Sequence, residues 1–440
     1  MKLLIIVFAF AFLSSAVSIE RLIPAGASVV EAPSPSLNKR WAKDKWGNGL
    51  ESQRRAVTIR ASKNDTDDVA DDFLWAMRRA NKGGLFHLEK GKTYVIGKKL
   101  DLSWLNDIYV KLDGEIKFTN NITYWQSDYF YYPFQKSITF WVWGGKNIKL
   151  YGSGTLNGNG QAWYDAFAGK QILDPGNTFL RPILFLTDNA TNVEVEGIKF
   201  LNSPCWNTFL VRTKDITFDH CRFDAVSTNV SSRPANTDGF DSLNVDGLTV
   251  TNTEVNVGDD CFSPKPNTTN ILVKNLWCNG THGVSMGSIG QYPGVLDFIS
   301  NAWLENITLL NGQNGARLKA WAGENVGYGY ITNITYKDVH VENTDHPIVL
   351  DQCYFNINET ACAQYPSNVN ISDVRFINVH GTSSGLEGRV VADLTCSPGA
   401  TCEGIHLEDI DITSPAGGPP VIVCNNISGD IGVECVSDEE

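Results

Sequence analysis

Short runs in which apolar and polar residues alternate recur along most of the chain, and each run is followed by Asn, Gly or Asp. This alternation, together with many β-branched residues, is typical of half-buried β-strands. Their first residues lie roughly 22 to 38 positions apart, a repeat length that indicates a solenoid rather than a β-sandwich. The clearest runs cover residues 192–200, 215–223, 248–255, 270–278, 302–310, 331–341, 369–379 and 405–412.

The repeat predicts an all-β solenoid, and a single-stranded parallel β-helix fits it best. One coil cannot bury its apolar face alone, so neighbouring coils stack and share one long core. Residues 67–80 are predicted to form a short N-terminal helix that caps the open end of this core. The apolar face of that helix contains Val69, Phe73, Met77 and Ala80.

The chain divides into three predicted parts. Residues 1–18 combine one Lys with a short apolar run and small residues, which predicts a secretory signal peptide. Residues 19–55 show no periodicity and are expected to form an N-terminal arm, and residues 56–440 are expected to form the β-helix. Within it, the aromatic stretch 124–134 is too irregular for a coil. It is either a loop over a cleft or a loop packed on the barrel.

Cysteine usage agrees with export to an oxidising compartment. The ten cysteines all lie from residue 205 onward and fall into consecutive close pairs. No pair has the spacing of a zinc site, so no metal or other cofactor is expected. Eleven N-x-S/T sequons are potential glycosylation sites. Pairing of neighbours predicts the disulfides 205–221, 261–278, 353–362, 396–402 and 424–435.

The net charge of −13 argues against a nucleic-acid partner, because a phosphate binder needs a basic surface. No stretch after the signal peptide is apolar enough to span a membrane, so we expect a secreted, soluble and monomeric protein. A polyanionic ligand would need cations placed locally within this acidic chain.

Stacked coils convert sequence spacing into spatial proximity, because equivalent positions on adjacent strands lie about 4.8 Å apart. Asp238 precedes Asp259 by one coil, and His282 follows Asp259 by one coil. Adjacent acids such as Asp259 and Asp260 usually belong to solvated turns. Here Gly258 permits a bend, so both side chains can reach the same groove. Crowded carboxylates raise each other's pKa, which keeps one of them protonated as a general acid.

Cations and a tyrosine continue the series in later coils. Arg317 and Lys319 are two residues apart and share one face of a strand, while Tyr354 follows in the next coil. Such cations match the carboxylate of a uronate sugar. Each residue alone has a simpler interpretation as part of a solvated surface, but their joint recurrence at coil spacing favours one site.

Five motifs in this order, "NTDGFD", "GDDC", "GTHGVSMGSIG", "RLK" and the Tyr of "DQCY", resemble the polygalacturonase family of glycoside hydrolases. The resemblance covers roughly residues 60 to 430. It implies a right-handed parallel β-helix that hydrolyses α-1,4-linked galacturonate in pectin with inversion.

The resemblance also implies a role for each residue. Asp259 would be the general acid, Asp238 and Asp260 would hold and activate water, and His282 would support the protonation state of the acid. Arg317, Lys319 and Tyr354 would bind substrate. Coil stacking alone places the carboxyls about 5 Å apart, a separation more typical of retaining glycosidases, so inversion rests on the resemblance.

The stretch that contains Gly258 resembles exo-acting members more than endo-acting ones, which predicts release of single galacturonic acid units. Lys265 and the aromatic stretch 124–134 are candidates for the wall that closes one end of the groove, where Lys265 is also expected to bind substrate. Two alternatives stay open. A hydrolase of the same fold would act on rhamnogalacturonan or xylogalacturonan, and a pectate lyase would use Ca²⁺ and an Arg base.

Overall fold

The computed structural model describes residues 28–30, 51–171, 174, 176–355 and 357–437. The expected signal peptide and most of the expected arm lie outside these residues. Within the described part of the arm, β1 (Ser28–Val30) pairs antiparallel with β2 (Arg55–Thr58). Among the described residues no helix is both long and apolar enough to cross a bilayer.

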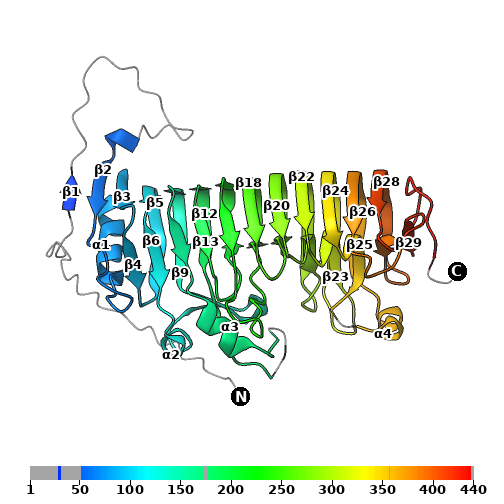
Figure 1. Ribbon diagram of the computed structural model, residues 1–440, viewed down its shortest axis with the longest axis horizontal. Coiled ribbons are helices and arrows are strands. Elements are labelled where there is room, and N and C mark those ends of the chain that lie inside the picture. Colours follow the sequence, from blue (N-terminus) through cyan, green and yellow to red (C-terminus); the bar gives the residue numbers. More distant parts are fainter. Residues whose placement is uncertain (1–27, 31–50, 172–173, 175, 356, 438–440) are drawn as a thin grey trace, which may run out of the picture.

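Most strands stack in parallel along one long axis and form the predicted β-helix (Figure 1). They form three columns, in which each strand pairs with the equivalent strand of the next coil. The first column starts from β2 and contains β3 (Gly84–Leu88), β5 (Leu100–Leu112), β9 (Trp141–Tyr151), β12 (Phe185–Glu196), β15 (Lys214–Asp219), β18 (Val245–Asn256), β20 (Thr268–Asn279), β22 (Leu296–Leu310), β24 (Tyr328–Thr344), β26 (Asn368–Ser383) and β28 (Cys402–Thr413).

The second column branches from β12. The third joins the first at β18, whose earlier residues pair with β15 and whose last residues pair with β16. The second contains β14 (Thr208–Val211), β17 (Phe240–Leu243), β19 (Phe262–Pro264), β21 (Val284–Ile289), β23 (Asn314–Trp321), β25 (His346–Tyr354), β27 (Val390–Thr395) and β29 (Val421–Asn425). The third contains β4 (Thr93–Ile96), β6 (Glu115–Phe118), β10 (Thr155–Asn157), β13 (Lys199–Leu201) and β16 (Arg222–Asp224).

Every coil contributes one residue to each apolar row inside the stack. In one row, Leu248, Ile271, Ala302, Ile334 and Val374 are paired in register, and all are buried. Burying one such large aliphatic side chain stabilises the fold by about 1.5–3 kcal/mol. Because the row continues without interruption from coil to coil, the register of the strands is fixed by the core.

Asparagines repeat at the turns as regularly as aliphatic residues repeat in the core. Asn275 donates from Nδ2 to Asn252 Oδ1 at 2.8 Å, and Asn306 donates to Asn275 in the same way at 2.8 Å. A second ladder joins Asn333 to Asn301 at 2.9 Å. These turn residues have φ between 50° and 58°, a region that Asn tolerates well. The residues that ended each run in the sequence are therefore ladder residues.

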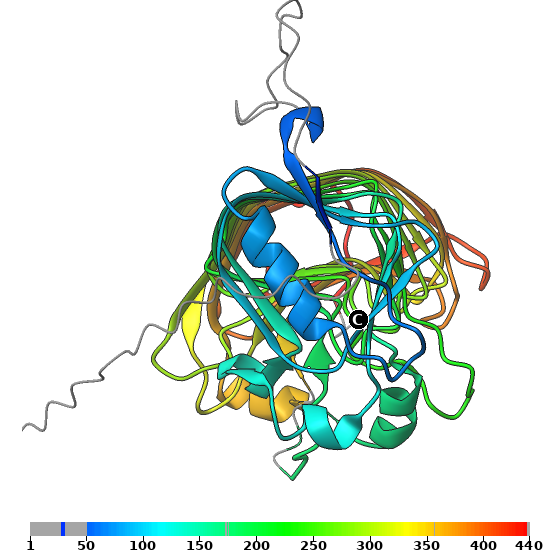
Figure 2. The ribbon, with the colours of Figure 1, turned by 90° about the vertical axis from the view of Figure 1, so that its left-hand side faces the viewer.

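The predicted capping helix is α1 (Ala70–Ala80), which lies across the first end of the stack (Figure 2). Phe73, Met77 and Ala80 are fully buried, and Phe73 packs against Phe86 of the first coil with ring centroids 5.1 Å apart. Helix α1 thus covers core residues that would otherwise contact water.

The remaining elements lie on one side of the rod, below the second column in the view of Figure 1. They are the helices α2 (Ile122–Trp125), α3 (Gln161–Phe167) and α4 (Glu359–Gln364), the 3-10 turn η2 (Phe134–Lys136) and a small sheet of β7 (Phe130–Tyr132), β8 (Ser137–Thr139) and β11 (Pro182–Ile183). A further 3-10 turn, η1 (Glu51–Gln53), precedes β2. The aromatic stretch 124–134 therefore contains short regular elements outside the coils.

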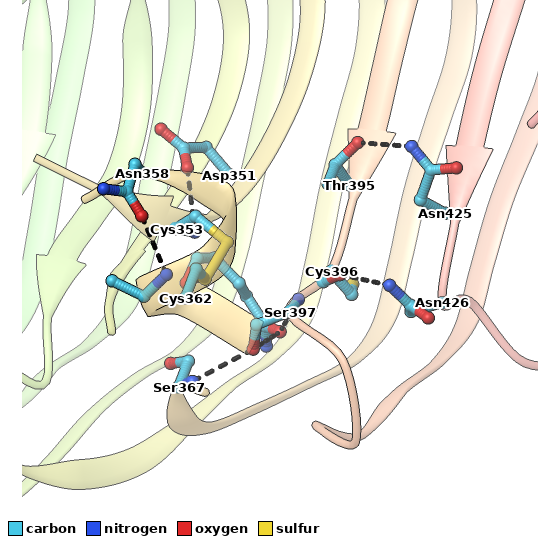
Figure 3. The surroundings of a disulfide bond; sticks show 12 residues. Asp351, Cys353, Asn358, Cys362, Ser367, Thr395, Cys396, Ser397, Asn425 and Asn426 are labelled. Carbon is cyan, nitrogen blue, oxygen red and sulfur yellow. Dashed lines mark hydrogen bonds between the residues drawn. A yellow bond between two sulfur atoms is a disulfide. The ribbon is translucent and has the colours of Figure 1, made fainter. Parts of the chain in front are cut away.

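Four of the five predicted disulfides are confirmed: Cys261–Cys278, Cys353–Cys362, Cys396–Cys402 and Cys424–Cys435. Figure 3 shows that Cys353–Cys362 ties the end of β25 to α4, whose first turn is capped by the side chain of Asn358.

The predicted pair 205–221 is wrong, because both cysteines are free and buried in separate apolar clusters. Cys221 lies in the main core, whereas Cys205 packs with Trp206 and Phe209 outside the coil.

Candidate active site

Three residues of the predicted site precede adjacent strands of the second column. Since Phe240, Phe262 and Val284 are paired in register, the residues two positions before them, Asp238, Asp260 and His282, lie on consecutive coils. Backbone hydrogen bonds extend this register beyond the strands: Gly239 donates to the carbonyl of Asp260 at 2.9 Å, and His282 donates to that of Asp259 at 2.9 Å.

A bend before β19 brings Asp259 to the same side as Asp260. A Cβ atom on Gly258 would lie 2.4 Å from the carbonyl oxygen of Pro234, so the close approach of these two segments requires glycine. Cys261 fixes the bend through its disulfide to Cys278. As a result, one carboxylate oxygen from each of Asp238, Asp259 and Asp260 lies within 4.8 Å of the others. The predicted meeting of the three acids is confirmed.

The three acids lie at a cavity of about 580 Å³. Asp259 is the most accessible of them, with 16% of its side chain exposed against 5% for Asp238 and 2% for Asp260. The cavity is lined by Gln135, Lys170, Gln171, Trp206, Arg233, Ala235, Asn236, Asp238, Asp259, Asp260, Lys265, His282, Ser288, Gln313, Lys319, Tyr354 and Phe355.

Asp260 is held as an ionised carboxylate. Burial favours its neutral form, but the ammonium of Lys319 forms a close ion pair with it and lowers its pKa below the usual range. Ser285 on β21 also donates to Asp260 Oδ1 at 2.9 Å. The two donors, Lys319 and Ser285, therefore stabilise the ionised form of Asp260, which is the form that can act as a base.

Asp238 has the opposite tendency. Burial raises its pKa well above the usual range, and the neighbouring Asp241 and Asp259 raise it further. Burial likewise raises the pKa of Asp241 to about 7, against the opposing attraction of Lys265 at 2.9 Å. Lys265 Nζ lies 3.9 Å from Asp238, so a single buried ammonium serves two buried acids. Among the acids of the site, Asp238 and Asp241 are therefore the two that most readily hold a proton.

Asp259 is surrounded by donors. Its Oδ1 lies 3.1 Å from His282 Nδ1, and its Oδ2 accepts from Asn236 at 3.3 Å. Burial acts to raise the pKa of Asp259, but the charge and hydrogen bond of His282 outweigh it and lower the pKa below the usual range. For His282, burial opposes the charged form and the pairing with Asp259 reverses the effect, so its pKa is raised. The Asp259–His282 pair thus carries a proton next to the cavity.

The charges of this cluster nearly cancel. Asp238, Asp241, Asp259 and Asp260 bring four negative charges, while Lys265, Lys319 and a protonated His282 bring three positive ones. One additional proton makes the cluster neutral. Buried charges are costly unless they are compensated, so the cluster favours a state with one proton shared among the four acids.

The predicted substrate-binding cations have different surroundings. Lys319 and Lys265 line the cavity, but both are nearly fully buried and are paired with acids of the cluster. Arg317 lies 3.5 Å from Asp351 and lines a neighbouring cavity of about 380 Å³. Tyr354 lines the main cavity, and the charged groups of Arg317 and Lys319 each lie 5.3 Å from its ring.

Sequence reasoning missed several residues of the site. Asp241 stands in the quoted motif "NTDGFD", three positions after Asp238, but only the register, which pairs it with Phe209, reveals that it lies on the outer face of the second column beside Lys265. Arg181 is buried and donates to Asn236, which in turn contacts Asp259, and no spacing pattern connects these residues. Arg233 lines the cavity, is exposed, and forms no ion pair with any described residue.

One side of the cavity is formed by the segment that contains η2. Gln135 lines the cavity. Its backbone, with φ of 47° and ψ of 30°, is not helical and interrupts the 3-10 turn η2. The segment is bridged to the loop after β21: the backbone N–H of Gln135 donates to Tyr292 Oη at 2.9 Å, and its side chain donates to Gln291 at 3.1 Å. Phe134 and Tyr292 also pack with ring centroids 5.8 Å apart. No residue of the expected wall 124–134 lines the cavity, and Gln135, the residue that follows this stretch, does so instead.

Comparison with known proteins places this geometry in a family. Residues 88–436 match the model of the glycosyl hydrolases family 28. Two curated relatives are each called "Probable exopolygalacturonase B". The one from Aspergillus terreus is 70% identical over 384 residues, 87% of this chain and 88% of its own length. The one from Neosartorya fischeri is 65% identical over 437 residues, 99% of this chain and 96% of its own length.

Solved structures show the same fold. The endo-xylogalacturonan hydrolase from Aspergillus tubingensis matches with a TM-score of 0.78 and 27% identity, over 87% of this chain and 99% of its own. A hyperthermoactive exopolygalacturonase from Thermotoga maritima matches with a TM-score of 0.64 and 18% identity, over 81% of this chain and 87% of its own.

Proposed function

The chain belongs to the glycosyl hydrolases family 28, and we propose that it is a secreted exopolygalacturonase that releases single galacturonic acid units from the end of polygalacturonate. The observation that carries this proposal is the cluster of Asp238, Asp259 and Asp260 at a cavity with a wall on one side. The high identity to relatives named exopolygalacturonase supports the exo mode.

The proposed reaction is inverting acid–base hydrolysis of an α-1,4 bond. Asp259 donates a proton to the glycosidic oxygen, because it is the most accessible of the three acids. The pairing with His282 keeps the pKa of Asp259 low, but a uronate carboxylate bound nearby would raise it. The proton of His282, whose Nδ1 lies 3.1 Å from Asp259, can then replace the one that leaves.

Asp260 and Asp238 are proposed to hold the attacking water together. Asp260 is ionised beside Lys319 and accepts a proton from the water. Asp238, with its raised pKa, keeps its own proton and orients the water by donating to it. The two acids are one coil apart and differ in protonation because one lies beside a closely paired lysine and the other shares Lys265.

Leaving-group chemistry distinguishes the acid from the other two carboxylates. A galacturonosyl fluoride needs no proton on its leaving group, so Asp259→Asn should hydrolyse the fluoride nearly as fast as the wild type does. On polygalacturonate the same variant should lose roughly 10²–10⁴ in kcat. Asp238→Asn is the matched control and should not be rescued by the fluoride. Rescue of Asp238→Asn instead would make Asp238 the acid.

Two product analyses test the remaining claims. Early products of polygalacturonate should be single galacturonic acid units, and a mixture of mid-length oligomers would contradict the exo mode. NMR of the first product should show the β-anomer, as inversion of an α-bond requires. This measurement matters because carboxyl oxygens within 4.8 Å resemble the spacing of retaining enzymes more than the usual 6.5–9.5 Å of inverting ones.

The similarity to a xylogalacturonan hydrolase favours one second candidate, hydrolysis of the xylose-substituted polymer. Rates on polygalacturonate and xylogalacturonan, measured side by side, decide between them. Retention of activity in EDTA would exclude the calcium-dependent lyase, a reaction that the ammonium groups of Lys265 and Lys319 beside the acids also disfavour.

A further inference from the structure

Two aromatic side chains are stacked on the outside of the β-helix, away from the acids just described. Phe298 on β22 and Tyr330 on β24 are paired in register, and their rings lie 5.5 Å apart with an angle of 12° between the planes. Tyr330 remains 37% exposed, and Tyr328 on the same strand is 48% exposed. Exposed aromatic patches on a secreted protein usually bind or are covered by something.

The next residue in this outer row is an asparagine. Asn370 on β26 is paired with Tyr330, so its side chain leaves the same face of the sheet one strand further on, about 4.8 Å away. Phe298 on β22 stacks on one face of the Tyr330 ring, and Asn370 lies in register with Tyr330 on β26, the strand on the other side of β24. The short amide of Asn370 cannot cover a whole phenol ring, which is consistent with the exposure of Tyr330.

Asn370 begins the sequon Asn-Ile-Ser, completed by Ser372. It is exposed, and its amide forms no hydrogen bond with any described residue. Asn333 in the sequon Asn-Ile-Thr on β24 provides a direct contrast. Its Nδ2 donates to Asn301 Oδ1 at 2.9 Å in the ladder, and its backbone has a φ of 55° between two adjacent coils. Both asparagines are exposed, but the Nδ2 of Asn333, the atom that would carry the glycan, already donates within the ladder, whereas the Nδ2 of Asn370 donates to no described residue.

We propose that Asn370 carries an N-linked glycan whose first sugar packs on the open face of Tyr330. The modification forms a bond between Asn370 Nδ2 and C1 of the sugar, breaks the C1–O bond of a lipid-pyrophosphate oligosaccharide donor, and releases the amide proton. Pyranose rings have an apolar face of C–H groups, so packing it on Tyr330 removes apolar surface of both partners from water. The proposal rests on secretion of the chain, not on its hydrolytic activity.

Site occupancy is measured on protein secreted by a fungal host. Enzymatic removal of N-glycans in H₂¹⁸O converts each modified Asn to ¹⁸O-labelled Asp, which peptide mass spectrometry detects. We expect nearly complete labelling of Asn370 and none of Asn333. An unlabelled Asn370 overturns the proposal. Hydrolysis of polygalacturonate by the same sample is a separate readout, so a failed glycan assignment and a failed enzyme assignment are distinguishable.

A second measurement tests the contact with Tyr330. Asn370→Gln should lower the Tm of the secreted protein by several degrees, and it should have no such effect when Tyr330 is already replaced by Ser. Endoglycosidase treatment that leaves only the first sugar should keep the Tm of the untreated protein. If Asn370→Gln lowers the Tm equally in the wild type and in Tyr330→Ser, the sugar does not pack on the ring. Asn333→Gln, as the control, should lower the Tm through the ladder without changing the glycan mass.

Discussion

The buried acid Asp241 should make the protein more stable at mildly acidic pH than at neutral pH. Burial raises its pKa in the folded protein to about 7, whereas the unfolded chain has the ordinary value of 3.8. A carboxyl with a raised folded pKa contributes stability that is fully present below the unfolded pKa and is lost as pH rises through the folded pKa. The contribution of Asp241 to the free energy of unfolding therefore decreases between about pH 4 and pH 7.

The size of the effect follows from the same two values. A difference of about 3 pH units corresponds to about 4 kcal/mol of unfolding free energy at about 1.4 kcal/mol per unit. Asp238, whose pKa is also raised, and His282 act in the same direction. Asp259 and Asp260 have lowered pKa values, so their contribution is present above about pH 4 and is lost only below it. The stability maximum should therefore lie between about pH 4 and pH 6.

Asp241→Asn removes this titration while keeping the shape of the side chain. Free energies of unfolding, obtained from guanidinium chloride curves followed by tryptophan fluorescence, should decrease between pH 4 and pH 7 by up to about 4 kcal/mol less in the variant than in the wild type. Asp215→Asn is the control, because Asp215 is exposed and its φ of 56° suits Asn equally well. If the profiles of Asp241→Asn and wild type run parallel over this range, Asp241 does not titrate as described.

Three further substitutions test the surroundings of the acids. Lys319→Met should destabilise the protein at pH 7 by about 3–5 kcal/mol, since it leaves Asp260 buried without its cation, and urea unfolding should show a smaller loss at pH 4. His282→Gln should lower kcat roughly 10²-fold with little change in KM, and an unchanged kcat in pH-controlled kinetics would remove it from the proton path. Arg233→Gln should raise KM for oligogalacturonates several-fold and leave kcat within twofold, whereas exposed Arg389→Gln should change neither value.

The sequence was sufficient to predict the strands and the meeting of the acids, because both depend on one repeated geometry. Alternation within a run defines which residues face the core, and the coil length defines which residues become neighbours. The three acids were therefore predicted to lie together, and the structure brings them together. Strand ends were less well predicted: β24 extends from Tyr328 to Thr344, beyond the expected run at 331–341. Its additional residues continue the ladder with the neighbouring strands and have no pattern of their own.

The pairing of cysteines and the burial of lysines could not be predicted, because they depend on whether a side chain points into the coil or away from it. Cys205 and Cys221 are close in sequence, but one packs outside the coil and the other inside it. The family resemblance implied that Lys319 binds substrate, and Lys265 was expected at the groove wall, whereas in the structure both are buried and paired with acids of the cluster. Gln135 joins the site through a loop that follows no repeat.

The commitment of these two lysines has a consequence for the reaction. A lysine that neutralises a buried acid cannot also neutralise a uronate without leaving that acid uncompensated. We therefore expect substrate carboxylates to pair with cations at the rim, where Arg233 forms no ion pair with any described residue. Substrate affinity and proton transfer then depend on different charges, one set exposed and the other buried. High salt should raise KM, because it screens the exposed charges that attract the substrate. It should leave kcat nearly unchanged, because the charges of the buried cluster are screened much less.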